Sequence, residues 1–527
     1  MQLTQGMVMP GWRVFWVPQE HAGSGVRRAV LDGWGDLQER EAAASIRAGD
    51  PIFLSPDHRV DPLLGAYARS RTFRRYTAET KRNYATDIAL LVTFLWGRGR
   101  GWTEARSRDL NDFEDWRRFA EANPKRIGGS KWDREQAAFY SLYRWAKDNG
   151  HVGSIPVSTV QSHDYHGVQV TTPTRSKDAR SANVHWLTPR TWRRWIDVGL
   201  RGHTKAGVVE SGWVGRTEDR NVAFVRLLVS SGLRRAEGGS LLTFEVPARR
   251  LEGGRYYRGQ VAAQVTRGKK MRTFYVASDA IGDVEVYVES SRALAVRQAQ
   301  RFGRYERLAG MWLVDEVTRG LKPKVRWRDR KGVEGERELN LLTAAERALL
   351  FTEGPRGPEP LWLWLNEQGL PLGIHSWDGV FREANQRCAW VLTPPARLGM
   401  DPHQVFAPYA TPHSARHSFA LYMLVVLERL ADLRYGLSPE ERRDFRLLYG
   451  DPWFLVQTLL GHASRDTTVR HYLAPVADLQ LRSMLDAIDG PTRAPMSELD
   501  DTFARIARES EGIQDLGDEI VPAGDGE

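Results

Sequence analysis

The stretch 459–472 constrains this 527-residue chain more than any other, with the sequence Leu-Leu-Gly-His-Ala-Ser-Arg-Asp-Thr-Thr-Val-Arg-His-Tyr. A helix is expected to end at Gly461, because glycine readily takes the left-handed conformation that closes helices. The polar Thr-Thr pair then restarts a helix that leads to Tyr472. A tyrosine at such a place is by itself most often half buried in a core. The polar string before Tyr472 argues against that role and favours a chemical one.

Two shorter clusters precede this stretch. Residues 231–237, Ser-Gly-Leu-Arg-Arg-Ala-Glu, put Arg234 just after a glycine turn, at a helix start where backbone N–H groups also favour an anion. Residues 413–417, His-Ser-Ala-Arg-His, put His413 and Arg416 on one helical face, so that both can meet one phosphate. Taken singly, the first is more often a surface arginine pair, and the second a capping histidine beside a solvated arginine.

The charge of the chain is distributed unevenly. Residues 496–527 contain ten acidic residues against Arg505 and Arg508, a net charge of −8, whereas the whole chain carries +9. The other 495 residues therefore carry +17. So large a positive charge on residues 1–495 favours a polyanionic partner, most commonly nucleic acid. The alternative is a charged surface that serves solubility alone.

Several classes of protein are excluded by the composition. Apolar residues make up 41% and charged residues 27%, which is typical of a globular chain. No apolar run is long enough to span a bilayer, and the N-terminus lacks the pattern of a signal peptide, so we expect no membrane partner. The single cysteine, Cys388, excludes a disulfide framework and a cysteine-rich zinc site. We expect a cytoplasmic protein, associated with the nucleoid when it acts on DNA.

Hydrophobic periodicity predicts two domains with additions. Helical patterns at 77–96, 110–122 and 131–148 indicate a compact helical module. A later domain opens at Thr188-Pro189, a helix cap, and contains a hairpin of strands at 256–266 and 271–277 with a basic tip. The predicted divisions are an extension at 1–60, the helical module at 61–157, a linker rich in Ser, Thr, Pro, His and Gln at 158–184, the second domain at 185–490, and an acidic tail at 491–527. The expected fold class is mainly α with a small antiparallel β-sheet.

The three clusters, in this order, resemble the catalytic boxes of the tyrosine recombinase, or phage integrase, family. The boxes are Gly-Leu-Arg-x-x-Glu, His-x-x-Arg, and Leu-Gly-His followed by a tyrosine. The residues that match them are Arg234 with the acid Glu237, then His413 and Arg416, then His462, and finally Tyr472. The resemblance covers most of residues 61–490. It implies a helical core-binding domain of the SAM-like kind that binds DNA, followed by an α+β catalytic domain.

The resemblance also implies a function. Members of the family are site-specific recombinases that cut and rejoin DNA through a covalent 3′-phosphotyrosyl intermediate, without metal, ATP or another cofactor, during integration or excision of a mobile element. It further implies double-stranded attachment sites as substrate and a homotetramer on DNA, and it leaves room for an accessory DNA-bending protein. We find no phosphate-binding glycine loop and no cluster that demands a metal.

The chain departs from the family pattern in two respects. The family places a lysine on a hairpin turn between the first two boxes, and here the turn reads Arg267-Gly268-Lys269-Lys270. An alignment anchored on Arg272 puts Arg267 at the lysine position. We favour Lys269 as the proton donor, with Lys270 second, because an ammonium gives up a proton and a guanidinium scarcely does. The boxes are also spaced more widely than in compact members, which predicts insertions around 305–354 and 430–451.

Residue chemistry agrees with this assignment. Arg234 and Arg416 can each hold two phosphate oxygens with a planar fork, and the histidines His413 and His462 can add hydrogen bonds or move protons. A tyrosine hydroxyl, with a pKa near 10, needs such a cationic setting to attack at neutral pH. Basic residues expected to contact the DNA backbone are Arg74, Arg75, Lys81, Arg82, Arg193, Arg194 and Arg267.

Three rival functions share parts of this pattern. A type IB topoisomerase would use the same residues to relax supercoils, but the helical module ahead of the catalytic domain favours a recombinase. A non-catalytic DNA-binding relative would have no need of Tyr472. A metal-dependent transposase would need a spaced set of carboxylates, and none outweighs the tyrosine boxes.

Overall fold

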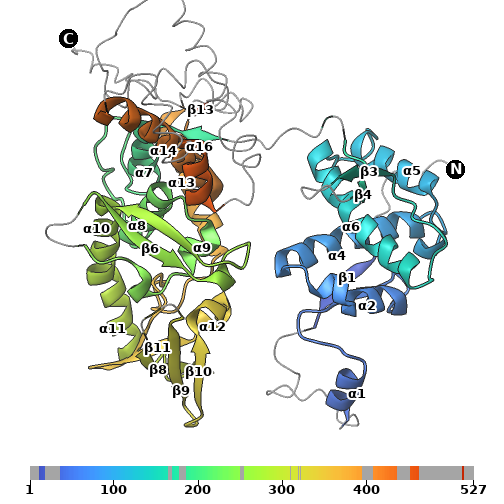
Figure 1. Ribbon diagram of the computed structural model, residues 1–527, viewed down its shortest axis with the longest axis horizontal. Coiled ribbons are helices and arrows are strands. Elements are labelled where there is room, and N and C mark those ends of the chain that lie inside the picture. Colours follow the sequence, from blue (N-terminus) through green and yellow to red (C-terminus); the bar gives the residue numbers. More distant parts are fainter. Residues whose placement is uncertain are drawn as a thin grey trace, which may run out of the picture. The chain divides into compact units, whose positions relative to one another are not determined.

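The computed structural model describes residues 11–17, 36–163, 169–176, 178, 185–249, 254–308, 310–318, 320, 322–393, 407–435, 452–461 and 513–514. The chain divides into two compact units, Met1–Ser181 and Ala182–Glu527 (Figure 1), and each is described by itself. The described residues are mainly helical, with several small sheets.

The first unit is a helical module with two small two-stranded sheets. Its helices are α1 (Leu37–Ala43), α2 (Pro62–Arg69), α3 (Arg71–Arg74), α4 (Ala78–Trp96), α5 (Ser107–Arg118) and α6 (Gly129–Asp148). Strands β1 (Arg13–Trp16) and β2 (Pro51–Leu54) pair antiparallel. Helix α4 begins where the sequence predicts, because the Thr77 hydroxyl accepts a hydrogen bond from the Thr80 N–H at 3.2 Å.

Aromatic side chains and buried ion pairs hold these helices together. The rings of Phe113, Trp132 and Phe139 pack against one another with centroids 5.8 to 6.2 Å apart. Between α4 and α6, the buried carboxylate of Asp87 lies 2.7 Å from the ammonium of Lys131. Such pairing is needed because an unpaired buried charge is costly.

The segment 158–184, predicted as a linker, contains a β-hairpin. Strands β3 (Thr159–His163) and β4 (Gln169–Pro173) pair antiparallel, and the hairpin is tied to α6. The Tyr140 hydroxyl donates to the Thr171 carbonyl at 3.2 Å, and the Ser176 N–H donates to Asp133 at 2.8 Å. Most of the hairpin residues whose burial is described are exposed, so the strands carry no apolar alternation by which the sequence could reveal them.

In the second unit, the first box lies between α8 (Glu218–Ser231) and α9 (Arg235–Gly239), and the second box lies at the start of α14 (Pro412–Tyr435). The other described helices of this unit are α7 (Pro189–Gly199), α10 (Ser278–Tyr287), α11 (Ala293–Arg301), α12 (Ala344–Arg347), α13 (Ser376–Leu392) and α16 (Pro452–Leu460). A π-helical turn, Val288–Arg292, joins α10 to α11. Strand β5 (Trp186–Leu187) pairs parallel with β13 (Ile513–Gln514). As predicted, Thr188 caps α7, and Pro189 is its first residue.

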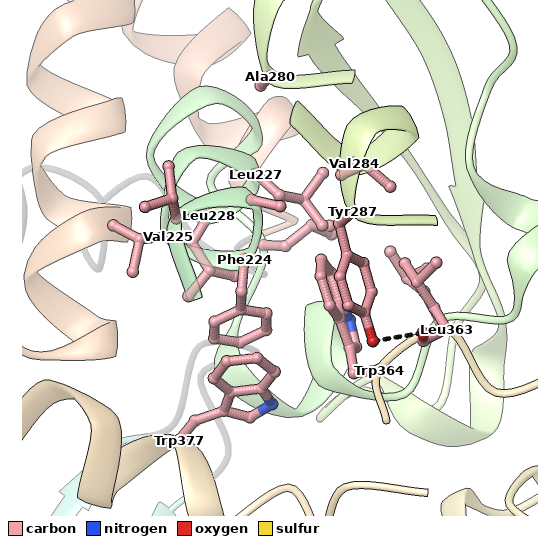
Figure 2. Packing of buried hydrophobic residues seen from close by; sticks show 14 of the residues in the cluster. Phe224, Val225, Leu227, Leu228, Ala280, Val284, Tyr287, Leu363, Trp364 and Trp377 are labelled. Atoms are coloured by element: carbon pink, nitrogen blue, oxygen red, sulfur yellow. Dashed lines mark hydrogen bonds between the residues drawn. The ribbon is translucent and has the colours of Figure 1, made fainter. Parts of the chain in front are cut away.

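Helix α8 lies within the core of this unit. Phe224 stacks on Trp377 with ring centroids 3.5 Å apart, and Trp364 meets Phe224 edge-on and stacks on Tyr287 (Figure 2). The Tyr287 hydroxyl donates to the Leu363 carbonyl at 3.4 Å. Because α8 is surrounded by these rings and by α10 and α14, its C-terminal end, from which Arg234 follows, is fixed in place.

The insertion predicted at 305–354 forms most of a five-stranded sheet, in the order β10-β9-β8-β11-β12. The strands are β8 (Trp312–Val317), β9 (Lys324–Asp329), β10 (Glu334–Glu338), β11 (Leu350–Gly354) and β12 (Gly357–Pro360). The fold-class prediction of a small antiparallel sheet needs correction here, because β11 pairs parallel with β8. Cross-strand ion pairs such as Arg326–Glu336 (2.9 Å) give the strands a charged pattern that hid them in the sequence. The sheet lies at the end of the unit opposite α16 (Figure 1).

Candidate active site

The turn after α8 brings Arg234 to the surface of the second unit. Gly232 has a φ of 62°, and a Cβ there would lie 2.3 Å from the ring of Phe419, so only glycine allows this turn. Glu237 closes the start of α9, because its carboxylate accepts from both the backbone N–H and the guanidinium of Arg234, each at 2.9 Å. The Arg234 side chain is 25% exposed, so its guanidinium is oriented from within and still open to solvent.

Arg416, from the first turns of α14, lies beneath this turn. It is fully buried, and its Nη1 donates to the Gly232 carbonyl at 2.5 Å. Its Nη2 donates to the carbonyl of Leu460, the last residue of α16. The two arginines of the first two boxes are thus held at one place together with the helix end that precedes His462.

Glu237 and Arg272 form a buried ion pair next to these arginines. Arg272, the first residue of β7 (Arg272–Ala277), places its Nη2 2.5 Å from the Glu237 carboxylate, which is 1% exposed. Burial would raise the pKa of Glu237. The charge and hydrogen bond of Arg272, together with the charges of Arg416 and Arg234, outweigh burial and lower the pKa to about 2.

This pKa predicts an acid-sensitive fold. Because the folded value of about 2 lies below the ordinary 4.5, the ionised Glu237 stabilises the fold above pH 4.5, and this stabilisation is lost as pH falls from 4.5 towards 2. It amounts to something on the order of 3 kcal/mol. Denaturant unfolding of the wild type and Glu237→Gln from pH 7 to pH 3 should show a difference in unfolding free energy that shrinks as pH falls. A difference that stays constant over this range would contradict the assignment.

His413 lies near the start of α14 and is exposed to solvent as a residue. Its ring meets the ring of buried His417 edge-on, with centroids 4.4 Å apart. Burial of the ring against its neighbours, and then the positive charges of Arg416, Arg234 and Arg267, lower the pKa of His413 to about 4. At neutral pH this histidine is therefore uncharged, and its N–H can donate to an incoming anion.

The hairpin loop that carries the candidate lysines is longer than predicted. Strand β6 (Tyr256–Val261) ends five residues before the expected position 266, and a short 3-10 turn, Ala263–Val265, follows. The Thr266 hydroxyl then closes the tip by accepting from the Lys270 N–H at 3.1 Å. Lys269, with a φ of 51°, turns its ammonium back onto the Gln264 carbonyl at 2.6 Å. The loop residue whose charge acts on His413 is Arg267.

His462 and Tyr472 lie outside the described residues, but the approach to them is described. Helix α16 ends at Leu460, and Gly461 has a φ of 65°, which confirms the predicted helix end. His462 is the next residue along the chain.

The candidate DNA contacts differ in how accessible they are. Arg74 is held in the fold by Asp50, 2.6 Å from its Nη2, and is therefore ill placed to bind a phosphate. Arg194 donates to the Lys205 carbonyl. The exposed candidates are Arg75 and Arg82 in the first unit, and Arg193 and Arg267 in the second, while Lys81 is half-buried.

Arg272 belongs to this site, although the sequence predicts for it only an alignment position after the basic hairpin tip. Nothing in its local sequence indicates that it pairs with an acid 35 positions earlier. Within the described ranges, no group of His, Cys, Asp and Glu could hold a metal ion. No helix in the same ranges has both the length and the apolarity needed to cross a membrane.

Comparison with known proteins finds no matching family model and no matching curated protein. Several solved structures are similar at a distance, including the following three. XerH site-specific recombinase bound to difH substrate, in a pre-cleavage complex, is 10% identical over 77% of this chain and 80% of that chain, with a TM-score of 0.38. XerH in a post-cleavage complex with a palindromic difH substrate is 10% identical over 82% of this chain and 87% of that chain, with a TM-score of 0.42. The Tn1549 transposon integrase (residues 82–397) in complex with circular intermediate DNA is 13% identical over 79% of this chain and 97% of that chain, with a TM-score of 0.39.

Proposed function

We propose that this chain is a site-specific DNA recombinase of the integrase kind, which cuts and rejoins strands through a covalent link to Tyr472. The observation that carries the proposal is that Arg416 joins the turn before Arg234 to the end of α16, while His413 lies within reach of the charges of both arginines. His462 follows Gly461 in the sequence. Arg234 and Arg416 lie 182 positions apart in the sequence, and with His413 they belong to the first two of the boxes that the sequence singles out. A DNA-binding surface without chemistry would not require this grouping.

The grouping suits a phosphodiester as substrate. In-line attack at phosphorus concentrates negative charge on the non-bridging oxygens. Arg234 offers a guanidinium that is already oriented by Glu237, so little reorganisation is needed when this charge develops. Neutral His413 adds an N–H donor within the field of three arginine charges. The site thereby supplies the electrostatic stabilisation of a phosphoryl transfer from its own side chains.

The proposed reaction conserves the energy of the broken bond. The hydroxyl oxygen of Tyr472 attacks phosphorus and loses its proton, the bond from phosphorus to the 5′-oxygen breaks, and the leaving oxygen takes up a proton. The products are a 3′-phosphotyrosyl link and a free 5′-hydroxyl. Attack by the 5′-hydroxyl of another strand reverses these steps and releases the tyrosine, so no ATP is consumed.

The substrate and partners follow from this reaction. Double-stranded attachment sites would be bound by the helical core-binding module at 61–157 and the catalytic domain at 185–490, with phosphate contacts from exposed arginines such as Arg75, Arg82 and Arg193. Exchange between two duplexes needs four cleavages, which favours a homotetramer on DNA, with or without an accessory DNA-bending protein. The protein would act in the cytoplasm, at the nucleoid, on DNA of a mobile element.

A covalent-trapping experiment tests the proposal. The wild-type chain is incubated with a candidate-site duplex nicked near the cleavage position, so that the released fragment diffuses away and the covalent product accumulates. A protein–DNA adduct on a denaturing gel, formed in chelator and without ATP, is the expected result. Absence of an adduct on the proper site would overturn the proposal. Efficient relaxation of a plasmid without any such site would favour the topoisomerase function instead.

The proton donor can be assigned with a substrate whose 5′-bridging oxygen is replaced by sulfur. A thiolate leaves without a proton, so loss of the general acid should matter little on this substrate. If Lys269 is the acid, Lys269→Ala slows adduct formation by roughly 100-fold on the oxygen substrate and recovers with sulfur. Arg267→Ala is the matched control, since a guanidinium that only stabilises charge leaves both substrates slow. Recovery of Arg267→Ala alone would reverse the two roles.

A further inference from the structure

We propose that Arg272 is a positioning residue, which fixes the end of α16 relative to the guanidinium of Arg234; this inference rests on the proposed function. Its guanidinium connects three elements that are distant in sequence. Nη1 donates to the Leu459 carbonyl at 2.9 Å, at the end of α16, and Nη2 donates to Glu237 at 2.5 Å, in α9. The side chain itself starts from β7 and is only 10% exposed.

The end of α16 is held by two arginines. Carbonyls in the last turn of a helix lack partners within the helix, and positive charge is favourable there. Arg272 takes the carbonyl of Leu459, and Arg416 takes that of Leu460. Two consecutive carbonyls are thus fixed by guanidinium groups from two different elements, β7 and α14. The direction in which the chain leaves the helix is therefore set at the residue before Gly461.

The turn at Gly461 fits closely against Arg272. Gly461 has a φ of 65°, and a Cβ at this position would lie 2.9 Å from the Cδ of Arg272. The aliphatic part of Arg272 therefore forms the surface against which the turn closes. His462 is the next residue along the chain.

Glu237 connects this support to the first box. One carboxylate oxygen accepts from Arg272 and from the backbone N–H of Arg234, and the other accepts from the Arg234 guanidinium. Removing Arg272 would leave Glu237 free to turn and would release the Leu459 carbonyl at the same time. Because both terminal nitrogens of Arg272 are already engaged inside the protein, it serves the reaction by positioning Arg234 and the end of α16.

The same unit offers a matched control in Arg347. This arginine is 1% exposed, donates from Nε to the Ser240 carbonyl at 3.0 Å, and pairs with Glu245. It thus makes the same kinds of contact, a backbone carbonyl and a glutamate, but neither contact is with α16. Variants of Arg347 report what loss of a buried arginine does to the fold alone.

The experiment compares Arg272→Lys and Arg272→Met with Arg347→Lys and Arg347→Met in the full chain. Thermal unfolding, affinity for the site duplex, and the single-turnover rate of adduct formation at saturating DNA are measured for each. We expect Arg272→Met to lower the rate by about 100-fold with nearly unchanged affinity, because a shift of about 1 Å in a reacting group has an effect of this size. Arg272→Lys, which keeps the charge, should recover part of the rate. The Arg347 variants should lose stability but keep a rate within about 2-fold of the wild type.

A second measurement keeps the inference testable where Arg272→Met does not fold. The effect of Arg272→Lys on the rate of adduct formation is measured twice, once in the otherwise wild-type chain and once in a chain that also carries His462→Ala. If Arg272 acts through the chain after Gly461, its effect falls to within about 2-fold once His462 is absent. An equal effect in both backgrounds, or equal rates for the Arg272 and Arg347 variants, overturns the inference. Absence of an adduct with the wild type would instead overturn the proposed function, so the two failures are distinguishable.

Discussion

Tyr472→Phe is expected to abolish the covalent protein–DNA adduct and to leave DNA binding unchanged. The substitution removes one hydroxyl oxygen and keeps the ring. Loss of a catalytic nucleophile lowers rates by at least about 10⁴-fold, because the remaining residues have no reacting group to act on. The measurement is adduct yield on the nicked duplex, with binding followed separately by gel shift.

The control for this substitution is Tyr409→Phe. Tyr409 is 55% exposed, belongs to the same unit, and stands only four positions before His413. It lies outside the three boxes, and its loss should leave the adduct yield unchanged. An undiminished adduct with Tyr472→Phe, or a lost adduct with Tyr409→Phe, would mean that the nucleophile has been misassigned.

Arg416→Lys should produce the second-largest loss. The guanidinium of Arg416 is fully buried and bridges the carbonyls of Gly232 and Leu460, which an ammonium cannot do in the same geometry. We expect the single-turnover rate of adduct formation to fall by roughly 1000-fold, because loss of this bridge displaces both the turn that carries Arg234 and the end of α16, and one displacement of about 1 Å can already cost about 100-fold. Unfolding free energy should fall by about 2–4 kcal/mol, because two carbonyls and a buried charge lose their geometry. Rates are compared below the unfolding transition.

Arg292→Lys is the matched control for Arg416. Arg292 is also buried, at 7% exposure, and its guanidinium donates to the carbonyls of Leu363, Pro360 and Trp362 at 2.5 to 3.2 Å. Its variant should lose comparable stability with little change in rate. If both variants lose the same fraction of activity, the loss reflects the fold of the unit, and the role assigned to Arg416 is wrong.

The parts of the site that depend on local sequence could be predicted. A glycine that closes a helix, an acid three residues into the next helix, and a histidine one turn before an arginine are short-range patterns. Gly232, Glu237 and Gly461 lie in the structure as those patterns require. Thr77 and Thr188 cap their helices for the same reason.

The parts that depend on long-range contacts could not be predicted. Arg272 gains its role only when β7, α9 and α16 meet, and each contact spans 35 or more residues. The hairpin β3–β4 and the sheet β8–β12 are rich in polar or charged residues, because much of their surface faces solvent and is held by cross-strand pairs. Residue type alone favours Lys269 as the proton donor, but it does not predict the left-handed backbone of Lys269 or the hydrogen bond from its ammonium to Gln264.

Mapping the covalent link tests most directly whether Tyr472 is the nucleophile. The adduct formed by the wild-type chain is digested with protease and nuclease, and the peptide that retains a nucleotide is sequenced by mass spectrometry. We expect one modified residue, Tyr472, joined to the 3′-phosphate of the cleaved strand. A nucleotide on any other residue, or a link through a 5′-phosphate, would contradict it.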